Sequence, residues 1–348
     1  MPPHEPPAEA APGREGSPSP APGPSGAHSE VLISTTFGPR DFLERWAEAL
    51  RAHGLVVQAW PDAVGDLSRV EFAVTFDPPP GLLARCPNLK AIHSMGAGVS
   101  PGMLGGDVCP AHLPLLRVVD PLMAQRMATF VLWAVINCQR KCDEYLAAQQ
   151  AQSWDQGKAV ESYRQVDNGE LRVGVMGAGH LGSAAIDLLL KCGYSVNAWT
   201  RTPRALPGAA CFHGRPQLHR FAERCDVVVC LVPLTPETSG ILDAAFFACL
   251  PRGAILVSLS RGQHLVEPDL LAALDSGHLA GAVLDVFRQE PLPPDSPLWR
   301  HPKVRVFPHA SCTPDMPRAV AQMVRLRELL LAGKPLPPEV VVDRQRGY

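Results

Sequence analysis

The segment LRVGVMGAGHLGSAAIDLLLK, residues 171–191, is the feature that most restricts how this chain can fold. An apolar, β-branched run leads into three glycines at Gly-x-Gly-x-x-Gly spacing, and a helical pattern follows. The first glycine permits a tight turn, the second lets the backbone approach phosphates, and the third lets helix and strand pack closely. An ordinary glycine-rich turn is the alternative, but the strand–turn–helix context predicts a dinucleotide site on a helix N-terminus. Its expected contact residues are Gly177, Gly179, His180, Leu181 and Gly182.

Strand and helix patterns alternate on both sides of this segment. The first series starts at Val31 with VLISTTF, and the second runs from Leu171 to the VRVFPH segment. Such alternation predicts βαβ units and parallel, doubly wound sheets, hence an α/β fold with two lobes. A helical region from about 124 to 154 separates the series. We expect the C-terminal segment VVDRQRGY to return to the first lobe after a helix near 317–332.

Composition excludes several classes of function. Hydrophobic residues make up 46% and charged residues 19%, and the formal net charge of −2 provides no basic surface for nucleic acid. No uncharged apolar stretch reaches the ~18 residues needed to span a bilayer. The histidines are scattered without the spacing of metal ligands, so no metal site is expected. The ten cysteines lack CxxC pairs, which favours a reducing, cytoplasmic location.

Residues 1–29 consist largely of Pro, Ala, Gly, Ser and Glu. They contain no apolar core of a signal peptide. A segment of this composition buries too little apolar surface to offset its ordering entropy, so it is predicted to be a disordered tail.

The turn after the strand SVNAWT indicates which nicotinamide cofactor is used. A site that prefers NAD places an acid there against the ribose 2′-hydroxyl. This sequence instead has Arg201, Thr202 and Arg204. Guanidinium groups bind phosphate through charge-assisted contacts, so these residues favour NADPH, with NADH still possible. A solvated basic loop is the alternative.

Three polar segments follow predicted strands of the second series. They are SLSRG with Arg261, LDVFRQEP with Asp285 and Glu290, and FPHAS with His309. Open α/β sheets place their sites at the carboxyl ends of strands. Reduction of a 2-keto acid needs a cation for the carboxylate, a proton donor for the carbonyl oxygen, and an acid that keeps this donor charged. Arg261, His309 and Glu290 match these roles in turn.

Each of the three residues has a simpler interpretation when taken alone. His309 fits a core histidine, Glu290 a loop acid before proline, and Arg261 a surface residue beside a glycine turn. Their order along the chain, each after a strand and downstream of the glycine segment, favours the catalytic interpretation.

These segments resemble the D-isomer-specific 2-hydroxyacid dehydrogenase family over nearly the whole chain after residue 30. The resemblance implies that Arg261, Glu290 and His309 are catalytic and that Asp285 binds the nicotinamide amide. It also implies that the loop Met95–Val99 binds the substrate carboxylate, through Ala97 and Gly98 together with Arg261. Further cofactor contacts are expected at Val232, Pro233 and Ser260.

Within the family, LKAIHSMGAGV, LVPLTPET and VDRQRGY are most similar to the glyoxylate/hydroxypyruvate reductase A group, which prefers NADPH. The resemblance implies a flavodoxin-like substrate domain, residues 30–123 and 312–348, and a Rossmann cofactor domain, residues 124–311. It also implies a homodimer held by the long helical region. Trp154 is the candidate for an aromatic that reaches the partner's site.

The sequence departs from the family at two positions and leaves other activities open. Ser258 stands where Asn is common, and Ser100 follows GAGV where Asp is usual. Neither departure removes a catalytic group, so both bear on which substrate is bound more than on whether the protein is active. The alternatives are a reductase for 2-ketogluconate, phosphoglycerate-type or bulkier 2-keto acids, and a binding protein that senses nicotinamide cofactors, like the family's transcriptional corepressors.

Overall fold

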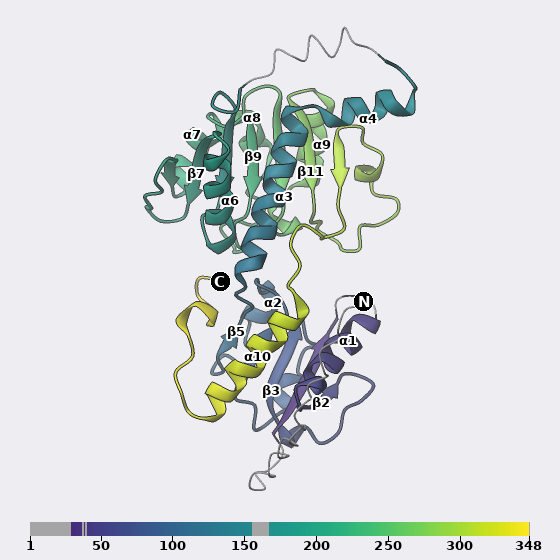
Figure 1. Cartoon of the computed structure of the whole chain (residues 1–348), viewed down its shortest axis with the longest axis vertical. Helices are drawn as coiled ribbons and strands as arrows, with labels where there is room; N and C mark the ends of the chain where they lie inside the picture. The colour runs from purple at the N-terminus through teal and green to yellow at the C-terminus, as the bar shows by residue number, and fades with distance from the viewer. Residues whose placement is uncertain (1–28, 37, 39, 155–166, 348) are drawn as a thin grey trace, which may run out of the picture.

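The structure, a computed structural model, describes residues 29–36, 38, 40–154 and 167–347. Within these residues the strands form two parallel sheets, each flanked by helices, in two lobes that follow one another along the longest axis (Figure 1). This confirms the predicted α/β class. The tail predicted for residues 1–29 lies outside the described residues except for Ser29, whose carbonyl oxygen accepts a hydrogen bond from Arg327 at 2.9 Å.

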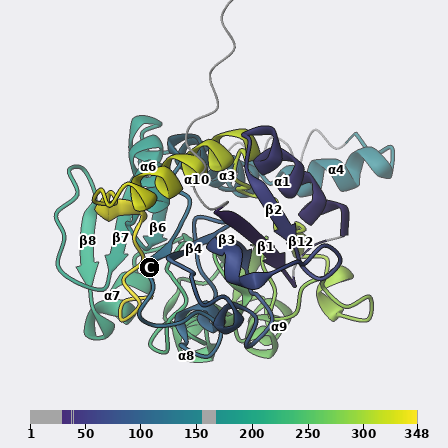
Figure 2. The same cartoon turned by 90° about the horizontal axis from the view of Figure 1, so that it is seen from below.

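The first sheet has the strand order of flavodoxin-like folds. Its order is β2-β1-β3-β4-β5, and all pairs are parallel. The strands are β1 (Glu30–Thr35), β2 (Val56–Ala59), β3 (Val70–Phe76), β4 (Ala91–Ser94) and β5 (Leu115–Leu116). Helices α1 (Arg40–Ala52) and α10 (Met316–Leu331) lie together over one face, so a helix from the far end of the sequence completes this lobe (Figure 2).

Alternation of side chains explains why both faces of this sheet are covered. Val31 and Ile33 pack with α1 and α10, whereas Leu32 packs into the opposite core. That second core lies under short helical elements. They are η1 (Leu67–Arg69), η2 (Leu83–Arg85) and α2 (Pro101–Leu104).

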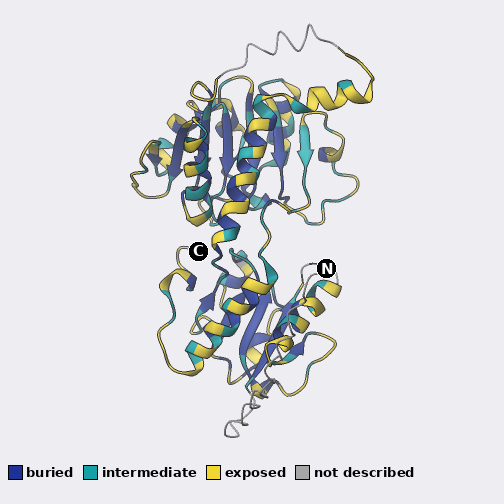
Figure 3. Cartoon of the chain, viewed as in Figure 1, coloured by how far each residue is buried: buried dark blue, intermediate teal, exposed yellow. Residues whose placement is uncertain are grey.

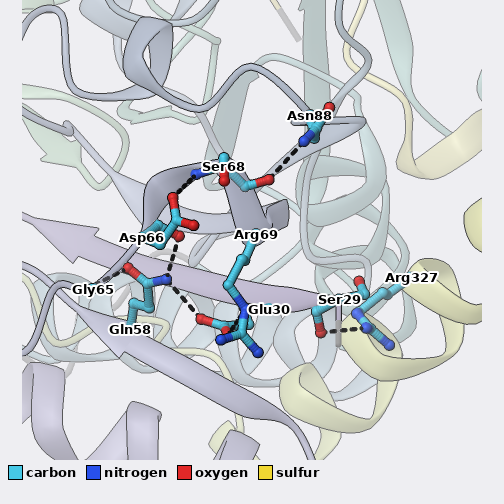
Figure 4. Close-up of polar contacts among 9 residues, drawn as sticks. All are labelled: Ser29, Glu30, Gln58, Gly65, Asp66, Ser68, Arg69, Asn88 and Arg327. Carbon is cyan, nitrogen blue, oxygen red and sulfur yellow. Dashed lines mark hydrogen bonds and ion pairs between the residues drawn. The ribbon is translucent and has the colours of Figure 1, made fainter. Parts of the chain in front are cut away.

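A polar network joins the amino ends of β1 and β3 to Gln58 of β2, at the edge away from the other lobe (Figure 4). The Glu30 carboxylate, which is 6% exposed, accepts a hydrogen bond from Gln58 at 2.6 Å and pairs with Arg69 at 2.7 Å. Gln58 also bonds the backbone at Gly65 and Asp66. Because a buried carboxylate is costly without partners, these contacts are structural.

The second sheet has the doubly wound order of a Rossmann fold, β12-β11-β10-β9-β6-β7-β8, with all pairs parallel. The chain builds outward from β6 in both directions, so the order reverses between β6 and β9. The strands are β6 (Arg172–Met176), β7 (Ser195–Thr200), β8 (Ala210–His213), β9 (Val227–Cys230), β10 (Ala254–Ser258), β11 (Leu279–Leu284) and β12 (Val304–Val306).

Helices cover both faces of this sheet, and its central strands are buried (Figure 3). On one face lie α3 (Pro121–Gln139) and α6 (His180–Lys191). On the other lie α7 (Leu218–Ala222), α8 (Ala244–Cys249) and α9 (Glu267–Asp275). The remaining described 3-10 helices are η3 (Arg215–Gln217), η4 (Gly262–His264), η5 (Pro297–Trp299) and η6 (Pro338–Val340).

Two expectations about secondary structure were incomplete. The helical region predicted for 124–154 is two helices, because the chain turns at Arg140 and Lys141, where Lys141 has a left-handed φ of 51°. The second helix, α4 (Cys142–Gln150), projects from the lobe (Figure 1). The short strands β5 and β8 were not predicted, since two to four residues give too little periodicity.

Two segments connect the lobes. Helix α3 contributes Met123 to the first lobe's core and Met127 to the second, and the stretch between β12 and α10 leads back. As expected, the C-terminal segment returns to the first lobe, where Val342 N donates to Leu115 O at 2.8 Å. The domain limits at 123/124 and 311/312 stay a prediction. Among the described residues, no helix is long and apolar enough to cross a membrane.

Candidate active site

The glycine segment forms the turn between β6 and α6. Gly177 has a φ of +95°, and a Cβ there would lie 2.8 Å from Leu231 O. A Cβ on Gly182 would overlap the carbonyl oxygen of Gly177, so helix and strand approach closely only with glycine. Gly179 caps α6 and has open space where a side chain would point. The turn and the first amides of α6, at His180 and Leu181, therefore fit a pyrophosphate.

The basic turn after β7 reaches the glycine segment. Arg201, Thr202 and Arg204 are all exposed, and the Arg204 guanidinium donates to the carbonyl oxygen of Ala178. The structure thus brings Arg204 beside the predicted pyrophosphate site, with Arg201 and Thr202 on the same turn. No acid lies between Thr200 and Arg204.

The ends of β9 and β10 meet beside the glycine turn that follows β6. Val232 is buried, and its carbonyl oxygen accepts from the Ser260 hydroxyl. Pro233 O accepts from Thr238 Oγ1 at 2.7 Å, which shapes the following loop. The predicted cofactor residues Val232, Pro233 and Ser260 therefore lie together at the point where the strand order reverses.

Asp285, at the end of β11, fixes the backbone of residues 309–311, the histidine segment. It is fully buried, and its oxygens accept from Ala310 N at 2.7 Å and Ser311 N at 3.0 Å. Its carbonyl oxygen accepts from His309 N at 2.9 Å. Sequence reasoning missed this anchoring role, and the contact with the nicotinamide amide stays a prediction.

The side chains of Glu290 and His309 are joined by a hydrogen bond. Glu290 Oε2 lies 2.7 Å from His309 Nδ1, and Oε1 accepts from Phe287 N at 2.9 Å. Burial raises the pKa of Glu290, but the bonds from His309 and Phe287 and the charge of Arg261 bring it below the ordinary value. The Glu290 carboxylate is therefore ionised near neutral pH.

Arg261 connects this pair with the first lobe. A Cβ on Gly98 would lie 2.5 Å from Arg261 Nη2, so the guanidinium rests against the loop after β4. Nη1 donates to Ser260 O at 2.7 Å. A Cβ on Gly262 would overlap the Phe287 carbonyl, so glycine lets the Arg261 segment approach the Glu290 loop. The predicted residues Arg261, Gly98 and Glu290 are thereby brought together.

Two polar residues that support the Gly98 loop were not identified from sequence. Ser94, fully buried at the end of β4, donates to Gly98 O at 2.9 Å and accepts from Gly96 N at 3.2 Å. Asp77 follows β3 and accepts a hydrogen bond from the Ser100 hydroxyl. Both residues stand at the carboxyl ends of strands in the first sheet, where parallel sheets place their sites, and this position is the sequence signal that could have identified them.

Two further observations concern the chemistry of the site. In the described part of the chain, no group of three or more His, Cys, Asp or Glu residues has the arrangement of a metal site. Ser258, where the family commonly has Asn, is fully buried, and within the described residues its hydroxyl has no hydrogen-bond partner.

Comparison with known proteins assigns the family. Residues 132–311 match the pattern described as D-isomer specific 2-hydroxyacid dehydrogenase, NAD binding domain. A family structure from Xanthobacter autotrophicus Py2, solved with NADPH and MES, is 38% identical over 92% of this chain and all of its own, with a TM-score of 0.81. The chain belongs to the D-isomer specific 2-hydroxyacid dehydrogenase family.

Two other solved structures support the same family assignment. The NADPH-dependent glyoxylate/hydroxypyruvate reductase of Sinorhizobium meliloti, solved with NADP and sulfate, is 33% identical over 92% of this chain and 100% of its own, with a TM-score of 0.82. A family protein from Klebsiella pneumoniae 342 is 34% identical over 92% of this chain and 99% of its own, also at 0.82. This family member is an NAD(P)-dependent dehydrogenase.

The contact between Gly98 and Arg261 gives a first prediction. In Gly98→Ala the new methyl group must displace the guanidinium, so we expect kcat/KM for a 2-keto acid to fall about tenfold or more. Steady-state oxidation of NADPH measures this. Gly106→Ala is the control. This glycine is exposed, and a Cβ added there would lie 3.7 Å from its nearest neighbour, the Cβ of Ala111, so the variant should retain wild-type kinetics. Equal kinetics in both variants would show that the observed approach is not needed for catalysis.

Proposed function

We propose that this dehydrogenase reduces small 2-keto acids, with glyoxylate and hydroxypyruvate as the candidate substrates, and prefers NADPH. The observation that carries the proposal is the Arg261 guanidinium lying against Gly98, next to the Glu290–His309 pair. A cation facing a loop of backbone amides suits a carboxylate, and a protonated imidazole nearby suits the adjacent carbonyl oxygen.

The residues would divide the work as follows. Bound NADPH supplies the hydride for the keto carbon. Arg261 and the amides of Ala97 and Gly98 hold the substrate carboxylate and orient the carbonyl group. With Nδ1 of His309 paired to Glu290, Nε2–H donates the proton to the carbonyl oxygen, and Glu290 stabilises the imidazolium before transfer. Asp285 keeps the histidine segment in place through its backbone bonds.

The catalytic pair is tested with His309→Ala and Glu290→Gln. NADPH oxidation should proceed with glyoxylate and hydroxypyruvate, and more slowly with a bulkier 2-keto acid. His309→Ala should lose ~10²- to 10⁴-fold in kcat. Glu290→Gln keeps the size but removes the charge, so the alkaline limb of its pH–rate profile for reduction should move to lower pH. An unmoved limb would refute the role of Glu290. No turnover of any keto acid despite NADPH binding would favour a cofactor-sensing binding protein.

The preference for NADPH is proposed from Arg201, Thr202 and Arg204. We expect Arg201→Ser to raise KM for NADPH about tenfold or more and to leave KM for NADH nearly unchanged, because only NADPH carries the 2′-phosphate. Steady-state kinetics with both cofactors measure the ratio of KM for NADPH to KM for NADH. Arg220→Ser, at an exposed arginine on α7, is the control. A parallel change for both cofactors would contradict the assignment.

We also propose a homodimer in which α3 and α4 of two copies pack together. Five of the eight exposed large hydrophobic residues described lie between 133 and 154; they are Trp133, Ile136, Tyr145, Leu146 and Trp154. Trp154 is 91% exposed in the single chain, and we assign it to the partner's site. Sedimentation should show a dimer, and Leu146→Glu should dissociate it. Glu144→Gln, on the same helix, is the control. A monomeric wild-type protein would contradict the proposal.

A further inference from the structure

Asp77 holds a strained position at the edge of the first sheet that faces the second lobe. It directly follows β3 and has a φ of 49°, in the left-handed region that few residues other than glycine adopt. Its carbonyl oxygen accepts from Thr36 Oγ1 at 2.9 Å. Backbone strain of this kind persists where surrounding contacts enforce it, and it gathers at functional sites.

The side chain of Asp77 holds the end of the loop that contacts Arg261. The Ser100 hydroxyl donates to Asp77 Oδ1 and also caps α2, accepting from Met103 N at 3.3 Å. Asp77 thus fixes the point at which the loop becomes a helix. Gly98, two residues earlier, is the residue against which the guanidinium rests.

The charge of Asp77 also acts on Arg261. Burial lowers the pKa of the Arg261 guanidinium, while the negative charges of Glu290 and Asp77 raise it. One desolvated cation is therefore influenced by two carboxylates, Glu290 from the second lobe and Asp77 from the first. A substrate carboxylate adds a further negative charge to this group.

We propose that Asp77 is a positioning residue for the Gly98 loop and that its charge selects 2-keto acids with uncharged substituents over those with a second anionic group. This inference rests on the proposed function and names its substrate class. A monocarboxylate is stabilised by Arg261 despite the two acids. Arg261 carries a single positive charge, which the first carboxylate already neutralises. A second anionic group on the substrate therefore has no attraction to Arg261 left to offset its repulsion by Asp77 and Glu290.

Two variants separate the two roles of Asp77. Asp77→Asn removes the charge but keeps an oxygen that accepts from Ser100, and asparagine tolerates a left-handed φ. Ser100→Ala removes the bond but keeps the charge. Oxamate and oxalate are matched probes, because they are similar in size and carry one and two negative charges. Calorimetry with NADPH present gives their Kd values without turnover, and thermal unfolding checks that each variant is folded.

We expect the ratio of oxalate affinity to oxamate affinity to rise about tenfold in Asp77→Asn and to stay within about twofold of wild type in Ser100→Ala. Ser100→Ala should instead weaken both ligands by a similar factor and raise KM for the keto acid. An unchanged ratio in Asp77→Asn would overturn the charge role, and unchanged binding and KM in Ser100→Ala would overturn the positioning role. Failure of the proposed function appears separately, as a wild-type protein that binds both probes but reduces no 2-keto acid.

Discussion

The approach of the Arg261 guanidinium to Gly98 is the contact on which the rest of the site depends. It joins a residue after β10 of the second sheet to a loop after β4 of the first. A desolvated cation is costly unless nearby groups compensate, and Glu290 of the second lobe and Asp77 of the first provide negative charge. The contact needs Gly98 for space and Gly262 for the close approach to Phe287.

The folds of the two lobes explain why these residues meet. Parallel strands end at one edge of a sheet, and the loops from both sheets that carry the catalytic candidates follow strand ends. Within the second lobe, Asp285 ties the His309 segment to the end of β11, while Phe287 N and His309 together hold the Glu290 carboxylate. Each candidate catalytic residue is thus held by at least one contact with the backbone, Arg261 by Ser260 O, Glu290 by Phe287 N and His309 by Asp285 O.

Local patterns in the sequence predicted most of the fold and pointed to the residues that the structure brings together, whereas their catalytic roles stay a prediction. The glycine spacing predicted the β6–α6 turn, and polar residues after apolar runs predicted Arg261, Glu290 and His309. What remained hidden is non-local. The contact of Ser100 with Asp77 and that of Arg204 with Ala178 join residues more than 20 positions apart, and nothing in their spacing specifies the pairing. The break between α3 and α4 at Lys141 was also not predicted, because the helical pattern of the sequence continues through it.

The most direct test of this account is a crystal structure with NADPH and oxamate bound. The account predicts that the oxamate carboxylate lies between the Arg261 guanidinium and the backbone amides of Ala97 and Gly98, with its amide carbonyl oxygen in hydrogen-bond distance of His309. An oxamate carboxylate bound away from Arg261, or a Gly98 loop that does not face the ligand, would contradict the central claim.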